Sequence, residues 1–164
     1  MGSRKARTLL AFLGARGAVK ARVPEIAQAV WGDRQPVDPA ANVATLVSRL
    51  RARFGVDVVL GTRTGYRIGE IRVDLHEAAD LVGKAEKALA RAQPAFALLV
   101  AEQVIKLIGD DEMLAGNNAA WAEEARTAQK ALLHKAWRLG AESAGRTGAP
   151  RLARAMAQMG HVAS

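Results

Sequence analysis

Residues 38–68 read DPAANVATLVSRLRARFGVDVVLGTRTGYRI, a polar helix start followed by an amphipathic run, a glycine and two short apolar segments. Asp38 can cap the free amide groups of a helix that begins at Pro39, because proline already has the required φ and has no amide hydrogen to lose. Gly55 is placed to end this helix. The sequence therefore predicts a helix over about residues 39–54.

The predicted helix has one apolar face and one face suited to a nucleic-acid groove. At about 100° per residue, four apolar side chains share a narrow arc and form the expected buried stripe: Val43, Val47, Leu50 and Phe54. The opposite arc holds small polar residues and arginine, which allow close approach and bidentate pairing with guanine or phosphate. The side chains expected to contact DNA are Asn42, Thr45, Ser48, Arg49, Arg51 and Arg53. Leu46 flanks this exposed arc.

Two short apolar runs, residues 57–60 and 65–68, lie on either side of a polar turn. This arrangement predicts a β-hairpin with a cationic tip, a wing over about residues 58–68. Its Arg63, Thr64 and Arg67 are expected to contact phosphates or an adjacent minor groove, which positions a domain without reading sequence.

The net charge of +8 lies wholly in the first 72 residues, which contain thirteen cations and five anions. Residues 73–164 contain eleven of each and are neutral. No acidic residue occurs between residues 40 and 54. An amphipathic helix with a solvated charged face and no partner would also carry arginine. The segregation of the charge nevertheless favours a module that faces a polyanion beside a neutral module.

The residues before the hairpin predict two further helices. One runs over residues 4–16, and the next has Pro24 in its first turn and Gly32 at its end. Three helices followed by a hairpin is the order of a winged helix-turn-helix, whose third helix reads a major groove. We therefore expect a winged-helix DNA-binding domain over residues 1–72.

The remaining residues, 73–164, predict a bundle of helices over about 73–92, 94–108, 118–144 and from Pro150 onward. The segment 94–108 is apolar around most of its girth and is expected at the centre of the bundle. Trp121 and Trp137 lie about 160° apart on one helix. Either both belong to the core, or one is buried and the other lies at an interface. The predicted fold class is mainly α, a winged helix followed by a TPR-like helical bundle.

The sequence contains no catalytic or metal-binding motif with its full set of required residues. Cysteine is absent, and the three histidines lack partner ligands at the spacing of zinc helices. The acidic run at residues 110–112 lacks the ligand ladder of a calcium loop, and the turn at residues 61–65 lacks the lysine–hydroxyl pair of a phosphate loop. No apolar stretch is long enough to cross a bilayer. We expect a cytoplasmic protein that is not an enzyme and uses neither a cofactor nor a metal.

Several short motifs resemble, in order and spacing, the SARP-type bacterial transcriptional activators. They are Trp31-Gly32-Asp33, Val47-Ser48-Arg49-Leu50-Arg51, Gly65-Tyr66-Arg67-Ile68 and Val73-Asp74-Leu75-His76. Residues 4–13 are similar to the first helix of that family. Residues 120–126 are similar to the Trp-containing start of a long helix in its activation domain.

The resemblance implies an OmpR-like winged helix joined to a bacterial transcriptional activation domain over residues 73–164. It implies binding to double-stranded DNA and recruitment of RNA polymerase. We also expect a cytoplasmic, nucleoid-associated location, with a homodimer as a further expected state. Ser48, Arg49, Arg51 and the wing residues are implied to face DNA. The family's small sheet ahead of its first helix has no counterpart before Arg4. Arg22 stands where the family has a small capping residue, so the second helix is expected to begin less well capped.

A second interpretation is a protein–protein interaction module that uses the winged helix and the bundle as docking surfaces without binding DNA. The missing sheet and the expected exposure of Leu46 support it. An exposed apolar residue suits a protein interface better than a phosphate backbone.

Overall fold

The computed structural model describes residues 4–109 and 113–162 and divides the chain into two compact units. The first unit spans Met1–Val73 together with Asn117–Ala122, and the second spans Asp74–Gly116 together with Glu123–Ser164. Helices make up most of the described residues, and a small antiparallel sheet lies in the first unit. The predicted mainly-α fold, a winged helix followed by a helical bundle, is confirmed. The acidic run at residues 110–112 lies outside the described residues.

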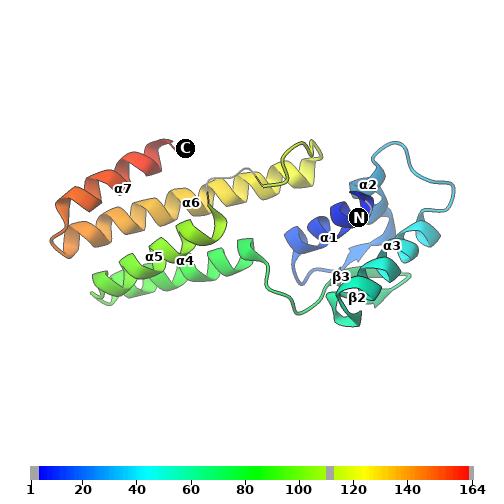
Figure 1. Cartoon of the computed structure of the whole chain (residues 1–164), viewed down its shortest axis with the longest axis horizontal. Helices are drawn as coiled ribbons and strands as arrows, with labels where there is room; N and C mark the ends of the chain where they lie inside the picture. The colour runs from blue at the N-terminus through cyan, green and yellow to red at the C-terminus, as the bar shows by residue number, and fades with distance from the viewer. Residues whose placement is uncertain (1–3, 110–112, 163–164) are drawn as a thin grey trace. The chain divides into compact units, whose positions relative to one another are not determined.

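Three helices surround the sheet in the first unit (Figure 1). They are α1 (Arg4–Arg16), α2 (Val23–Trp31) and α3 (Pro39–Phe54). All three begin and end close to the predicted residues. Asp38 caps α3 as expected, because its Oδ1 accepts a hydrogen bond from the backbone amide of Ala41 at 2.9 Å. Gly32 and Gly55 follow the ends of α2 and α3 with positive φ angles of 58° and 99°.

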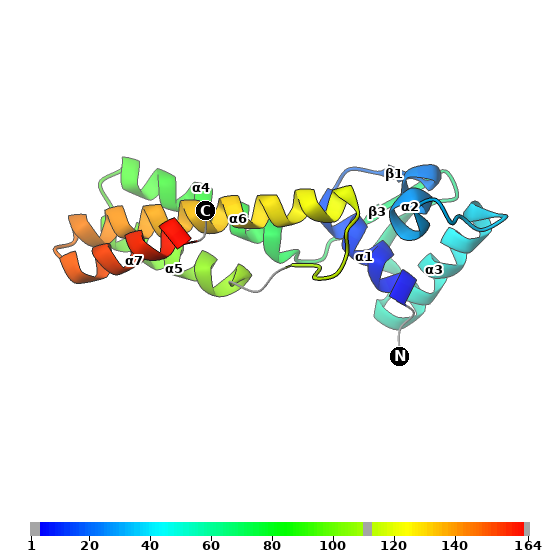
Figure 2. The ribbon, with the colours of Figure 1, turned by 90° about the horizontal axis from the view of Figure 1, so that it is seen from above.

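The sheet has the strand order β1-β3-β2, and both pairings are antiparallel (Figure 2). Its strands are β1 (Ala21–Arg22), β2 (Val59–Thr62) and β3 (Gly65–Ile68), and the 3₁₀ helix η1 (Val56–Val58) precedes β2. The predicted hairpin is present, but β2 extends into the predicted turn. Thr62 pairs with Gly65, so Arg63 and Thr64 alone form the turn. β1 was not predicted, because two residues are too few to form an alternating pattern.

The core of the first unit corrects two predictions for α3. Leu46 is only 5% exposed, whereas Phe54 is 55% exposed. The buried stripe consists of Val43, Leu46, Val47 and Leu50, the i, i+3, i+4, i+7 pattern of a helix face. The stripe is therefore centred closer to Leu46 than expected. Phe54 is the last residue of α3 and lies beyond the part of the helix that packs on the core.

The start of α2 corrects the expectation at Arg22. The Oε2 of Glu25 accepts a hydrogen bond from the Arg22 backbone amide at 2.7 Å, and its Oε1 binds Nη1 of Arg16 at 3.0 Å. The carboxylate three residues into the helix therefore satisfies the cap residue's amide. The hydrogen bond from the Arg22 amide holds the pKa of Glu25 below its ordinary value; partial burial opposes this and Arg16 reinforces it.

Replacing Glu25 with glutamine is expected to lower the thermal unfolding temperature near neutral pH, and the difference from wild type should vanish in acid. A depressed folded-state pKa stabilises the protein above the unfolded value of 4.5, and this contribution is lost as the pH falls through the folded-state pKa. Circular dichroism melts from about pH 7 to about pH 3 measure it. Glu70→Gln, an exposed carboxylate of the same unit, is the control. A Glu25→Gln difference that does not change with pH would contradict the cap.

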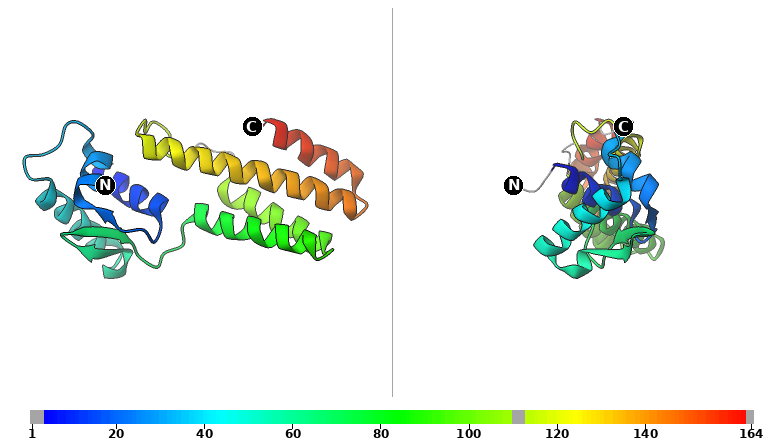
Figure 3. Two further views of the ribbon diagram at one scale, coloured as in Figure 1. Left: turned by 180° about the vertical axis from the view of Figure 1, so that it is seen from behind. Right: turned by 90° about the vertical axis from the view of Figure 1, so that its right-hand side faces the viewer.

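The described residues of the second unit form a bundle of four helices. They are α4 (Asp74–Ala90), α5 (Pro94–Ile108), α6 (Ala120–Arg146, of which the first three residues belong to the first unit) and α7 (Pro150–Val162). The views agree that α4 and α5 run antiparallel side by side and that α7 returns along the second half of α6 (Figures 1 and 3).

The outer face of α5 is exposed, which corrects its predicted central position. Ala97, Val100, Ala101 and Val104 are buried in the core, but Phe96 and Leu99 are about half exposed. Alanine and valine allow close packing on one side, and the larger apolar residues lie on the other. The apolar composition of this helix concealed its amphipathic arrangement.

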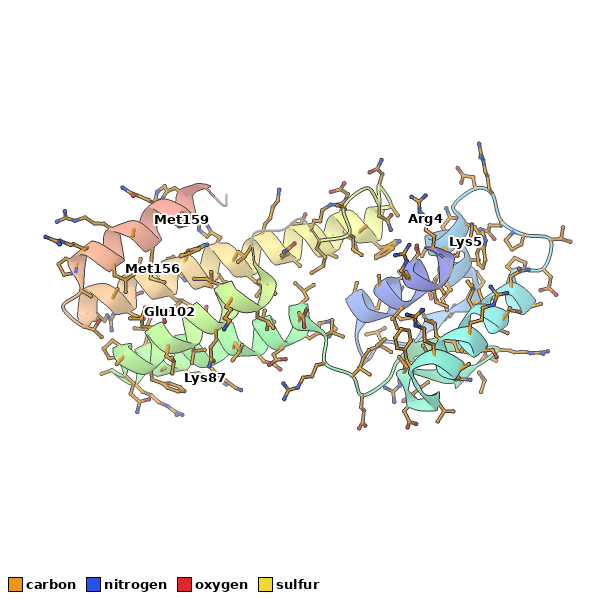
Figure 4. The ribbon with its side chains drawn as sticks, in the orientation of Figure 1. Arg4, Lys5, Lys87, Glu102, Met156 and Met159 are labelled. Carbon is orange, nitrogen blue, oxygen red and sulfur yellow. The ribbon has the colours of Figure 1, made fainter. Side chains whose placement is uncertain are left out.

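Both tryptophans of α6 are partly buried. Trp121 packs on the core of the first unit, where its ring lies 5.5 Å from that of Phe12 at an interplanar angle of 73°. Trp137 lines an apolar groove of about 390 Å³ in the second unit with residues of α7, among them Met156 and Met159 (Figure 4). Trp121 therefore lies at the edge of the first unit's core, and Trp137 lines a groove of the second unit.

Candidate nucleic-acid interface

The exposed face of α3 carries most of the predicted DNA-contacting residues. Asn42, Thr45, Ser48, Arg49 and Arg53 are all exposed. They project from a helix whose opposite face is fixed in the core by Val43, Val47 and Leu50. The structure therefore brings five of the six predicted helix residues onto one accessible surface.

Two of these side chains already use a donor within α3. The Nδ2 of Asn42 donates to the Asp38 carbonyl at 2.8 Å, and the hydroxyl of Thr45 donates to the Ala41 carbonyl at 2.9 Å. These bonds hold both side chains close to the helix. The Asn42 amide oxygen and the lone pairs of the Thr45 hydroxyl remain as acceptors for an external donor.

The arginines of this face differ in their surroundings. Arg49 forms no ion pair with the described part of the chain, so its five donors can reach an external acceptor. The guanidinium of Arg53 lies 5.3 Å from the centre of the Phe54 ring. This contact gives the exposed Phe54 a partner and orients Arg53 along the end of the helix.

Arg51 differs from the other predicted DNA-contacting residues of α3, because its donors are engaged within the first unit. Its Nε and Nη2 donate to the Val59 carbonyl at 2.9 and 2.7 Å, and Nη2 also donates to the Gly61 carbonyl at 3.0 Å. The side chain is partly buried between α3 and β2. Sequence periodicity placed Arg51 beside the exposed arc but could not show the neighbouring strand.

The tip of the hairpin carries a cluster of cations and hydroxyls. Lys20 Nζ donates to the Thr64 hydroxyl at 3.2 Å, and the hydroxyls of Thr62 and Thr64 lie 3.1 Å apart. Arg63 is exposed in the turn. Sequence analysis missed Lys20, because it comes from the loop before β1 and reaches the tip only through the pairing of β1 with β3.

Arg67, the third predicted wing residue, is less accessible than Arg63 and Thr64. It lies on β3 and is partly buried, and its Nη1 donates to the Ile68 carbonyl at 3.3 Å. The wing surface defined by accessible groups therefore consists of Lys20, Thr62, Arg63 and Thr64.

The described residues contain no group of three His, Asp or Glu side chains that could hold a metal ion. None of the described helices is long and apolar enough to span a membrane. The chemistry that the first unit offers is hydrogen bonding and positive charge on α3 and the wing.

Comparisons with known proteins give two curated relatives. The chain is 35% identical over 128 residues to the regulatory protein AfsR of Streptomyces griseus and 34% identical over 128 residues to the regulatory protein AfsR of Streptomyces coelicolor. The matched residues are 77% and 76% of this chain but only 13% of each relative. No protein-family model matches the chain.

Proposed function

The chain carries a SARP-type region, shared with the AfsR regulatory proteins over about three quarters of its length, and from this premise we propose that its first unit binds double-stranded DNA sequence-specifically. In this proposal α3 enters a major groove and the hairpin contacts the backbone. The proposed role of the whole chain is transcription regulation.

The observation that supports this proposal most directly is the accessible face of α3. It presents Arg49, which forms no ion pair with the residues that the structure describes, beside small polar side chains and no carboxylate. A solvated surface helix normally mixes charges of both signs. A face of arginine and short polar residues suits base edges and phosphates, because arginine pairs bidentately with guanine.

The two parts of the interface have different proposed roles. Arg49 reads a base edge, with Thr45 and Ser48 beside it as short acceptors or donors. Lys20, Arg63 and the hydroxyls of the wing bind phosphate oxygens and position the unit without selecting a sequence. Arg67 contributes charge near the wing.

The second unit is proposed to supply contacts with RNA polymerase or with a second copy of the chain. The AfsR relatives are regulatory proteins rather than enzymes, which agrees with a role in regulation and not in catalysis. The interaction-only alternative relied in part on an exposed Leu46, and this side chain is buried. DNA binding therefore remains the function that the first unit supports best.

Selection of bound fragments from a random duplex pool tests this function. At about 150 mM salt, purely surface attraction is weakened, so the retained fragments should share a sequence motif. An enriched motif would support sequence-specific binding and reveal the half-site spacing. Retention without enrichment would reduce the function to non-specific binding, and no retention would overturn it.

Arg49→Ala and Arg63→Ala are expected to separate base reading from backbone binding. Arg49→Ala should cost about 1–3 kcal/mol of discrimination between the selected sequence and random DNA, because a bidentate base contact is lost. Arg63→Ala should weaken binding to both DNAs alike. Fluorescence anisotropy titrations of each variant against both duplexes measure the two effects. Equal loss of discrimination in both variants would refute this division of roles.

A further inference from the structure

We propose that Arg51 is a positioning residue that ties the wing to the recognition helix, so that the phosphate contacts of one and the base contacts of the other act as a unit. The inference rests on the proposed function. It assigns Arg51 no contact with DNA.

The contacts of Arg51 lie on the outer edge of the sheet. In the order β1-β3-β2, β2 is an edge strand, and within the part of the chain that the structure describes the carbonyls on its outer side have no strand partner. Val59 and Gly61 are two residues apart and direct their carbonyls to the same edge. Arg51 satisfies both groups with one guanidinium.

The geometry of these contacts favours arginine over lysine. Nε and Nη2 of the planar guanidinium both donate to the Val59 carbonyl, at 2.9 and 2.7 Å, and Nη2 also donates to the Gly61 carbonyl at 3.0 Å. The guanidinium carbon lies 6.0 Å from the centre of the buried Tyr66 ring on β3. A lysine ammonium is a point charge on a flexible stem and cannot reproduce this fork.

The position of Arg51 connects the two proposed contact surfaces. It is two residues beyond Arg49 on α3, and its partner Gly61 is two residues before Arg63. The connection therefore consists of the Arg51 side chain and the end of β2. The strands also pack against α3 through a shared hydrophobic core that includes Val59, Tyr66 and Ile68. Arg51 adds hydrogen bonds from α3 to the edge strand, and without them Arg63 would bind phosphate less in register with Arg49.

A double-mutant cycle tests the coupling. Wild type, Arg51→Ala, Arg63→Ala and the double variant are titrated with the selected duplex over a range of salt concentrations. Arg63→Ala should reduce the steepness of the salt dependence by about 1. In the Arg51→Ala background the further change at Arg63 should have little effect, because residues that act as a unit are not additive.

Two further variants separate positioning from stability. Arg51→Lys keeps the charge and the stem but should show the same lost coupling. Val47→Ala removes buried apolar contacts of α3 but keeps the Arg51 side chain that donates to the Val59 and Gly61 carbonyls, so it lowers stability yet should leave the effect of Arg63→Ala as in wild type. Chemical unfolding measures the stability of each variant, so that variants of similar stability can be compared.

The outcomes test the positioning role of Arg51 separately from the proposed DNA binding. If the effects of Arg51→Ala and Arg63→Ala on duplex binding are additive, the positioning role is overturned while DNA binding stands. The same holds if Arg51→Lys keeps the full coupling to Arg63 that the wild type shows. Loss of base discrimination with unchanged coupling would overturn it too and make Arg51 a direct reader. Absence of duplex binding by the wild-type chain would overturn both.

Discussion

Affinity of the chain for duplex DNA is expected to fall about a thousandfold between about 50 mM and about 200 mM salt. A protein that neutralises phosphates releases their counterions, and about six phosphate contacts give a slope of log affinity against log salt near −5. The first unit has enough accessible cations for this number. They are Arg4, Lys5, Arg7, Lys20, Arg22, Arg34, Arg49, Arg53 and Arg63. Arg4 and Lys5 lie at the start of α1 (Figure 4).

Fluorescence anisotropy at a series of salt concentrations measures this slope. The joint change Lys20→Ala and Arg63→Ala should make it shallower by about 2, one for each lost phosphate contact. Arg154→Ala, an exposed cation of α7 in the neutral second unit, is the matched control and should leave the slope unchanged. An affinity that does not depend on salt would contradict a phosphate-binding surface. An equal effect of Arg154→Ala would contradict its assignment to the first unit.

The elements of the first unit that sequence analysis predicted well are those with local signals. Asp38 and Pro39 begin α3, and Gly55 ends it, through interactions within a few residues. Periodicity also located the accessible face, because Arg49 and its small polar neighbours lie opposite the core. Periodicity fixed the angles between side chains but not the direction of the core. For this reason Phe54 was predicted to be buried and Leu46 to be exposed, whereas the structure shows the reverse.

The features that sequence analysis missed depend on contacts between distant segments. Lys20 reaches Thr64 only because a two-residue strand pairs with β3. No local sequence pattern predicts so short a strand. Arg51 lies beside the exposed arc by angle alone, but the carbonyls of β2 occupy its donors. A carboxylate three residues downstream likewise supplied the cap that Arg22 was expected to lack.

Gly69→Ala is expected to destabilise the first unit by at least about 3 kcal/mol, the upper range for overpacked sites. A Cβ at residue 69 would overlap the Asp57 carbonyl oxygen and lie 2.8 Å from its carbon. Both atoms belong to the backbone of η1, so no side-chain rotation relieves the clash. The Gly69 amide also donates to the Val58 carbonyl at 2.9 Å, and separating the two segments would break this bond.

Urea unfolding followed by circular dichroism measures the loss, with Gly14→Ala as the matched control. Gly14 lies within α1 in the same unit, and an added Cβ there meets nothing within 4 Å. Because alanine favours a helix interior over glycine by about 0.5–1 kcal/mol, Gly14→Ala should be neutral or stabilising. The loss at Gly69 is large against the 5–15 kcal/mol that stabilises a typical domain. Wild-type stability in Gly69→Ala would contradict the close approach of residues 57 and 69, and with it the position of the hairpin against α3.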